Sequence, residues 1–434
     1  MAVTAAPAPV VRSKLNANQI KGFWAAWGGW CLDGMDAFIY ALVLAPALGE
    51  LLPRSGIEVN PGNTGYWGSA LQGLFLFGWG ASMIWGPIAD RFGRVKALMW
   101  TILFYSVFTF ACGLVVNVYQ LAFLRILCGI GLGGEQPMGG TFVAEEWPED
   151  RRKMGAGYMH TGYYFGFFLA ALANYFIGAN FGWRWMFILG GTPALLVGWI
   201  QSGVHEPQAW QKQAASRKER PKLMDAFTAL FTPEYRSRTI VNSLLFTVSI
   251  VGLWSGSVYV PLAVTQLAVK EGHTAQEAAR LASYGGGVLA IATIIGCLAA
   301  PKLAEAIGRA KAMGLYFVSL GVAVAIAFGY VFYQPAPLTE FFVMILFLGF
   351  GGANFALYTL WLPEQYGTAC RASAIAFISS VGRFVGVAMV FLVGGAIRSY
   401  GSLGVPVAWT VVAFVLGLIV LPFAYETKGR QLPA

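Results

Sequence analysis

The sequence predicts an all-α membrane protein with twelve transmembrane helices, built as two six-helix bundles related by a pseudo-twofold axis along the membrane normal. Of 434 residues, 57% are hydrophobic and only 11% are charged, whereas a soluble domain carries about a quarter charged residues. Stretches long enough to cross a ~30 Å hydrocarbon layer as helices lie at about 22–49, 64–89, 97–116, 119–145, 154–179, 183–204, 239–267, 280–300, 312–333, 338–363, 373–397 and 403–425.

A polar stretch divides the chain in the middle. We expect a cytoplasmic N-terminal tail over 1–20, a first bundle over 21–204, a cytoplasmic central loop over 205–238, a second bundle over 239–425 and a cytoplasmic tail over 426–434. Most of the 29 Lys and Arg residues then lie on the cytoplasmic side, as positive charge in short loops requires. The net charge of +9 is therefore interpreted as a sign of orientation in the cell (inner) membrane, and not of nucleic-acid binding.

One charged turn occurs once in each half. The segment 86–96, GPIADRFGRVK, lies between the second and third stretches, and 301–311, PKLAEAIGRAK, repeats its acid, glycine, arginine and lysine in register. An acid and an arginine seven residues apart also follow the fourth and the tenth stretches, at Glu145 and Arg152 and at Glu364 and Arg371. These repeats predict an internal duplication of the kind found in secondary transporters.

The turn at 86–96 resembles the G-x-x-x-D-R-x-G-R-x-K/R turn of the major facilitator superfamily, and the resemblance extends over essentially the whole chain. It implies the major facilitator fold, with a cavity near the membrane midplane and alternating access. The segment DGMDAF at 33–38, followed by PAL at 46–48, is similar to the first helix of proton symporters for sialic acid, aromatic acids and lactate. The ending YETKG at 425–429 resembles that of sugar porters instead.

The charged turns are predicted to control a cytoplasmic gate. An acid at Asp90 can bond the partly positive N-terminus of a neighbouring helix, which the resemblance implies is helix eleven, and Gly93 permits the sharp reversal. The alternative is that the arginines only keep the turn inside. The second copy has Ala306 where the first has an arginine, so Asp90 is expected to be the stronger of two unequal contacts. The predicted gating residues are Asp90, Arg91, Gly93, Arg94, Glu145, Arg152, Glu305, Arg309, Glu364 and Arg371.

Apart from one histidine, five acids and bases lie deep within the apolar stretches: Asp33, Asp36, Arg125, Glu135 and Arg383. Each costs about 2.5–3.5 kcal/mol to insert, so each needs a partner or a wet cavity. Asp36 and Arg125 fall at a similar depth and could pair, and Asp33 shares a helix face with Asp36. Asp33, Asp36 and Glu135 are therefore predicted to couple protons, with a permanent structural ion pair as the alternative.

Arg383 belongs to the second half, and a guanidinium there suits bidentate binding of a substrate carboxylate. The alternative is a bond to nearby backbone carbonyls. The predicted substrate-binding residues are Arg125, Arg383, Gln72, Asn354 and Tyr358. His160 of the fifth helix is expected to be a packed, hydrogen-bonded histidine, with a histidine that titrates at about pH 6–7 as the alternative.

The sequence predicts a transporter and not an enzyme. It contains no phosphate-binding loop, HExxH motif or His/Cys cluster, so neither a cofactor nor a metal is expected. The predicted function is proton-coupled symport of a small organic anion (an aromatic acid, sialic acid or another carboxylate) by a monomer in the lipid bilayer. The alternatives are a sugar porter and a proton-independent organic anion exchanger.

Overall fold

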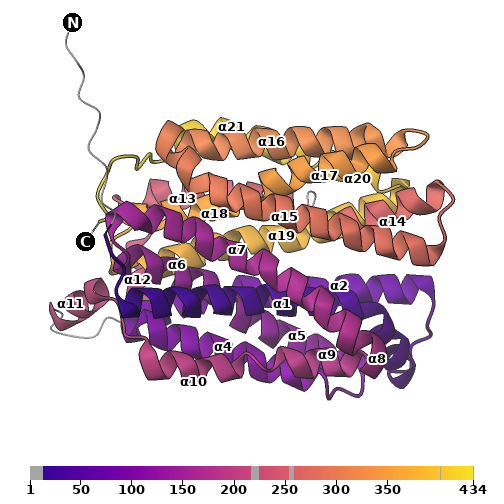
Figure 1. Cartoon of the computed structure of the whole chain (residues 1–434), viewed down its shortest axis with the longest axis horizontal. Coiled ribbons are helices and arrows are strands. Elements are labelled where there is room, and N and C mark those ends of the chain that lie inside the picture. Colours follow the sequence, from indigo (N-terminus) through magenta and orange to yellow (C-terminus); the bar gives the residue numbers. More distant parts are fainter. Residues whose placement is uncertain (1–12, 217–223, 254–258, 401, 434) are drawn as a thin grey trace, which may run out of the picture.

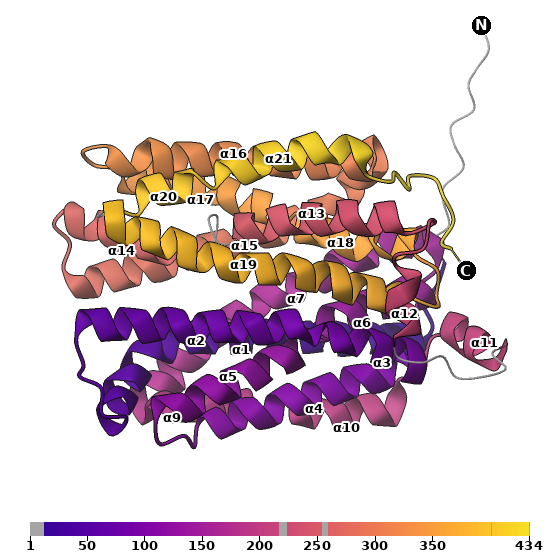
Figure 2. The same cartoon turned by 180° about the vertical axis from the view of Figure 1, so that it is seen from behind.

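The computed structural model describes residues 13–216, 224–253, 259–400 and 402–433, and these contain helices and turns but no strand. Figures 1 and 2 show two groups of helices lying side by side, one coloured indigo to magenta and one coloured orange to yellow. The first group comes from the N-terminal half of the chain and the second from the C-terminal half. The fold is therefore the all-helical arrangement that the sequence predicts.

The N-terminal half consists of helices that run up and down through the molecule. Its elements are α1 (Ala17–Arg54), α2 (Pro61–Ala81), η1 (Ser82–Ile84), α3 (Trp85–Phe92), α4 (Arg94–Cys112), α5 (Val118–Leu132), α6 (Glu135–Glu146), α7 (Glu149–Ala173), η2 (Asn174–Gly178), α8 (Ala179–Phe181), α9 (Trp183–Gly190) and α10 (Ala194–Gly203).

The short helices α11 (Gln208–Ser216) and α12 (Asp225–Ala229) follow, with residues 217–223 of the predicted central loop outside the described residues. The C-terminal half contains α13 (Arg236–Leu253), α14 (Val260–Lys270), α15 (Ala275–Ile307), α16 (Arg309–Gly329), η4 (Val331–Tyr333), α17 (Leu338–Gly352), α18 (Phe355–Trp361), η5 (Pro363–Gln365), α19 (Arg371–Tyr400), α20 (Gly404–Ala408), α21 (Val411–Val420) and η6 (Leu421–Phe423). Residues 254–258, within the predicted seventh stretch, also lie outside the described residues.

Polar caps explain where several of these helices begin. The side chains of Asn16, Asn60, Asn117 and Thr274 each accept a hydrogen bond from the backbone N–H three residues ahead, at the starts of α1, α2, α5 and α15. Such caps satisfy backbone donors that the helix itself leaves free.

Six described stretches are long and apolar enough to cross a membrane, and the bent helix α1 makes a seventh. Most of the other predicted stretches are divided into two consecutive helices, such as α5 and α6, which separate at Gly133 and Gly134. A Cβ on Gly133 would lie 1.8 Å from the Ser82 hydroxyl, so the close approach of η1 requires glycine there.

The two halves meet in two regions of helix packing. Helix α7 packs on α15, and α2 and α3 pack on α19. The start of α1 and the chain after η6 both lie at one end of the molecule, together with α11 and α12 (Figures 1 and 2). We call this the linker end, and it carries both copies of the charged turn.

Candidate functional site

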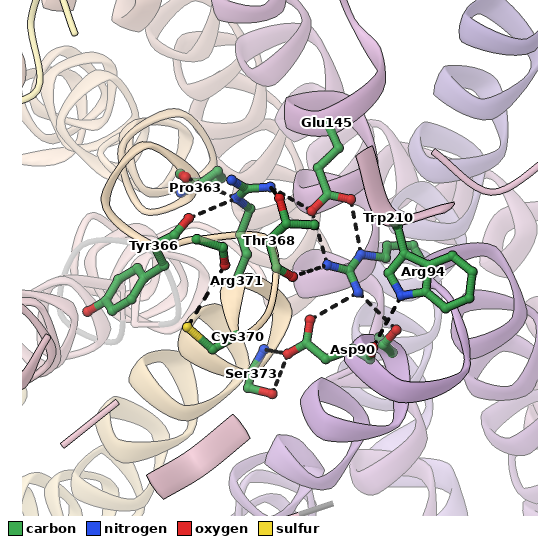
Figure 3. A network of polar contacts seen from close by, with 12 residues as sticks. Asp90, Arg94, Glu145, Trp210, Pro363, Tyr366, Thr368, Cys370, Arg371 and Ser373 are labelled. Carbon is green, nitrogen blue, oxygen red and sulfur yellow. Dashed lines mark hydrogen bonds and ion pairs between the residues drawn. The ribbon is translucent and has the colours of Figure 1, made fainter. Parts of the chain in front are cut away.

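Asp90 at the linker end of α3 connects the two halves (Figure 3). Its Oδ2 accepts hydrogen bonds from the Ser373 backbone N–H (2.9 Å) and hydroxyl (2.5 Å), and its Oδ1 lies 3.0 Å from Arg94 Nη1. Ser373 is in the first turn of α19, where the helix dipole favours a carboxylate. The contact that the sequence predicts between Asp90 and helix eleven is therefore present in this geometry.

Glu145 lies between two buried arginines that come from opposite halves (Figure 3). Arg94 donates to it from Nε (3.1 Å) and Nη2 (3.0 Å), and Arg371 donates from Nη1 (2.6 Å). Arg94 Nη2 also donates to the Thr368 carbonyl oxygen at 2.8 Å. Because each charge in this buried network has a partner, removal of one leaves another uncompensated.

The second copy of the turn makes a weaker contact between the halves. Arg309 pairs with Glu364 (3.0 Å) and with Glu305 (2.6 Å), all within the C-terminal half. Among the residues that the structure describes, Glu305 reaches the other half through Lys153 Nζ, at 2.8 Å. Its side chain is 41% exposed, against 2% for Asp90, and surface ion pairs contribute little.

Arg91, Gly93 and Arg152 complete the predicted gating set. Gly93 has φ of 118°, which a residue with a side chain rarely adopts. Arg91 lies over the Phe92 ring. Arg152 is buried, but its Nε and Nη2 find no hydrogen-bond partner in the described ranges, because Glu364 bonds Arg309 and the Thr427 hydroxyl instead. Arg152 therefore does not mirror Arg371.

Two glutamates that the sequence analysis left without a role cap the helices after the charged turns. Glu206 accepts hydrogen bonds from the backbone N–H groups of residues 95 and 96 at the start of α4, both at 3.1 Å. Glu426 does the same for residues 309 and 310 at the start of α16, also at 3.1 Å. Their equivalent places, just after the last stretch of each half, were the signal that could have identified them.

These two caps are expected to differ in their pH dependence. Burial raises the pKa of Glu206 despite its backbone hydrogen bonds. Burial also acts to raise that of Glu426, but the N–H groups of residues 309, 310, 427 and 428 outweigh it and lower the pKa. A lowered carboxyl pKa means that stability is present above the unfolded value and is lost as pH falls through the folded one.

We expect Glu426→Gln to lower the melting temperature at pH 7, because an amide cannot accept both N–H bonds and a helix cap contributes about 1 kcal/mol. The deficit should disappear once the pH is below the carboxyl pKa in the folded protein. Glu206→Gln should cost less, since the charged form of Glu206 is already disfavoured. Thermal melting of wild type and both variants from pH 2.5 to pH 8 tests this, and equal deficits at pH 7 would contradict it.

Asp36 and Arg125 face each other inside the N-terminal half. The Asp36 Oδ2 to Arg125 Nη1 distance is 3.9 Å, which is too long for a hydrogen bond. The guanidinium lies over the rings of Tyr40 and Phe75, at 4.3 and 4.0 Å from their centroids. No nitrogen of this guanidinium has a hydrogen-bond partner within the described residues, and the Asp36 carboxyl also interacts with the Thr109 side chain, so the ion pair is loose.

Asp33 of α1 and Glu135 of α6 are two further buried carboxyl groups, and both lie at α1. Glu135, the first residue of α6, lies against α1, so that a Cβ on Gly29 would be 2.3 Å from its Oε2. Asp33 is one turn further along α1 and shares that face. Both carboxyl groups are buried, and neither Asp33 oxygen has a hydrogen-bond partner among the residues the structure describes.

Arg383 of α19 faces the N-terminal half. Its Nη2 lies 3.4 Å from Gln136 Oε1, and its Cζ lies 4.4 Å from the Trp79 ring centroid and 5.7 Å from that of Phe246. Asp33 is close enough to interact electrostatically with the Arg383 guanidinium. Arg383 is 3% exposed, and Nη1 has no hydrogen-bond partner in the described part of the chain. The sequence analysis did not identify Gln136 as a site residue. Its place next to the buried Glu135 was the signal that could have indicated it.

The remaining predicted residues have different surroundings. Asn354 Nδ2 donates to the Gly351 carbonyl oxygen at 2.9 Å, and the Tyr358 hydroxyl lies 2.9 Å from that of Ser249. Gln72 is half-buried on α2. His160 Nδ1 has no hydrogen-bond partner among the described residues, so the expectation of a hydrogen-bonded histidine is wrong for that nitrogen.

Comparison with known proteins places this geometry in a family. Residues 26–391 match the model described as Major Facilitator Superfamily. A probable 4-methylmuconolactone transporter of Cupriavidus pinatubonensis is 28% identical, covering 95% of this chain and 92% of that protein. The niacin transporter NiaP of Acinetobacter baylyi is 26% identical over 94% of each. A structure of the proton:xylose symporter XylE matches with a TM-score of 0.74 and 19% identity, covering 96% of this chain and 98% of that one.

Proposed function

The chain belongs to the major facilitator superfamily, and we propose that it is a proton-coupled symporter of a small organic anion. The family and the relatives are membrane transporters and not enzymes. Residues 21–204 and 239–425 are then the two bundles of a monomer, and they rock about the central residues so that the site opens to one side at a time.

The observation that carries this proposal is the placement of Arg383. Its guanidinium is buried between the halves, lies over aromatic rings and keeps one nitrogen without a protein partner in the described ranges. A guanidinium in such a place suits a carboxylate. Relatives are named for transport of niacin, cis,cis-muconate and 4-hydroxybenzoate, which are unsaturated or aromatic acids.

Proton coupling follows from the charges around Arg383. Three buried acids, Asp33, Asp36 and Glu135, stand against two buried arginines, Arg125 and Arg383. An anion that reaches Arg383 adds negative charge close to Asp33, and like charges in a buried site favour protonation of a carboxyl group. Binding of substrate and uptake of a proton therefore support each other.

The network around Asp90 and Glu145 acts in this proposal as the closed cytoplasmic gate. In this proposal the linker end, with both termini, faces the cytoplasm, and the positive-inside distribution of Lys and Arg supports this orientation. Inward release of substrate then requires the bonds from Asp90 to Ser373 and from Glu145 to Arg371 to break, because these join the two halves.

Uptake into proteoliposomes tests the proposal. With an alkaline interior, the protein should accumulate 4-hydroxybenzoate, nicotinate or muconate above the external concentration, and should not accumulate glucose or xylose. Uptake of the sugars alone would favour a sugar porter. Exchange stimulated by internal anion, with no effect of pH, would favour an anion exchanger.

Asp36→Asn is expected to abolish uphill, pH-driven accumulation while exchange of labelled for unlabelled anion continues, because an amide neither carries a proton nor pairs with Arg125. The readout is the ratio of accumulation to exchange in the same vesicles. Glu340→Gln, at an exposed acid, is the matched control and should behave as wild type. Unchanged uphill uptake by Asp36→Asn would contradict a coupling role for this residue.

A further inference from the structure

Two buried ring nitrogens of the N-terminal half lack protein partners. His160 on α7 is 2% exposed and Trp30 on α1 is 4% exposed, and their ring centroids are 5.7 Å apart. Neither His160 Nδ1 nor Trp30 Nε1 has a hydrogen-bond partner in the described ranges. Leaving a buried polar group unsatisfied is unfavourable, so these nitrogens are candidates for contact with a bound molecule.

The pair lies where the two halves meet. The His160 ring is nearly parallel to that of Phe355 on α18, with an interplanar angle of 8° and centroids 6.3 Å apart. The Trp30 ring packs on Tyr163 at 4.9 Å. An aromatic wall of tilted and stacked rings therefore spans the interface, with contributions from α1, α7 and α18.

This wall is close to the arginine that we assign to the substrate carboxylate. Asp33 and Tyr163 are within electrostatic range of Arg383, and they follow Trp30 and His160 by three residues on α1 and α7. Both helices start at the linker end (Figures 1 and 2). Along their helices, the backbones of Trp30 and His160 thus lie about 4.5 Å closer to the linker end than those of Asp33 and Tyr163.

We propose that His160 and Trp30 form a second polar contact for the substrate and select aromatic acids that carry a hydroxyl group or a ring nitrogen. Arg383 holds the carboxylate, and the polar atom at the other side of the ring meets His160 Nδ1 and Trp30 Nε1. Indole can only donate a hydrogen bond, whereas imidazole can donate or accept. A hydroxyl group therefore suits both partners, and a pyridine nitrogen can accept from either. This inference rests on the proposed function, because it requires that a carboxylate binds to Arg383.

Calorimetric titration of the purified protein with four acids tests the inference. The probes are benzoate, 3-hydroxybenzoate, 4-hydroxybenzoate and nicotinate, so that only the second polar atom varies. Wild type should bind at least one substituted acid about tenfold more tightly than benzoate, because unsubstituted benzoate leaves the two nitrogens unpaired.

His160→Phe should erase this preference while benzoate affinity stays within about threefold, because the ring opposite Phe355 is kept and only the nitrogens are lost. Trp30→Phe, which removes the indole N–H, is the second variant and should reduce the same ratio. Tyr158→Phe is the matched control, because it removes a polar atom from an exposed position on α7 and should leave the ratio unchanged.

The outcomes separate this inference from the proposed function. The inference would be overturned if wild type bound all four acids equally well, or if both ring variants kept the wild-type ratio of affinities. Either result would indicate that trapped water satisfies the nitrogens. Failure of wild type to bind any of the four acids would instead overturn carboxylate binding at Arg383, and the inference with it.

Discussion

Arg383→Gln is expected to weaken binding of 4-hydroxybenzoate by about 100-fold, because hydrogen bonds to a charged group contribute about 1.5–3 kcal/mol. The buried guanidinium lies near the rings of Trp79 and Phe246 and faces the N-terminal half at Gln136. Arg383→Lys should recover part of this loss, since an ammonium keeps the charge but cannot grip a carboxylate bidentately. Titration calorimetry and the concentration dependence of uptake both measure the effect.

Arg280→Gln is the matched control for this experiment, because Arg280 is exposed near the start of α15. It should bind the acid as wild type does. Full affinity in Arg383→Lys would contradict a bidentate contact and would favour the alternative that Arg383 only satisfies neighbouring protein groups. Loss of affinity together with a lowered melting temperature in the lysine variant would identify a structural role.

Asp90→Asn is expected to open the linker end and to slow transport by about tenfold or more. The change removes a buried charge that bonds the first turn of α19 and Arg94, and breaking a buried ion pair costs about 3–5 kcal/mol. Cys370 reports on the opening, because it is 2% exposed and lies between Thr368 and Arg371 of the network. In a protein that retains Cys370 alone, labelling by a charged maleimide should become about tenfold faster.

Glu305→Gln is the internal control that the duplicated chain provides. Glu305 occupies the equivalent place in the second turn, but it is partly exposed, and its contact with the other half in the described ranges is with the half-buried Lys153. Its loss should therefore change Cys370 labelling and transport by less than about threefold. Equal effects of the two substitutions would show that the turns act symmetrically, and unchanged labelling in Asp90→Asn would show that Asp90 does not hold this end closed.

The fold could be predicted from the sequence because its causes are local or compositional. Apolar stretches of membrane length and the repeated turn depend on residues that are neighbours along the chain. The rare buried charges could be listed for the same reason, since an ionisable residue in an apolar stretch is conspicuous. Asp36 and Arg125 could even be paired, because residue counts along two helices give their depths.

Partners that depend on how helices rotate and approach could not be predicted in this way. The break at Gly133 and the contact of Glu135 with Gly29 arise from close packing of different helices. The sequence does not show which groups Gln136, Glu206 and Glu426 bind, because their hydrogen-bond partners come from distant parts of the chain.

The sequence alone thus determined the class of the protein, its two halves and the charges that must be compensated inside a membrane. Only the tertiary structure decided which charges are compensated: Asp90 and Glu145 are bonded across the halves, whereas two nitrogens of Arg152 and one of Arg383 lack hydrogen-bond partners in the described residues. The physical reason is that hydropathy and charge belong to the residues themselves. A hydrogen bond, in contrast, requires two groups from distant parts of the chain to meet at about 3 Å with the right orientation.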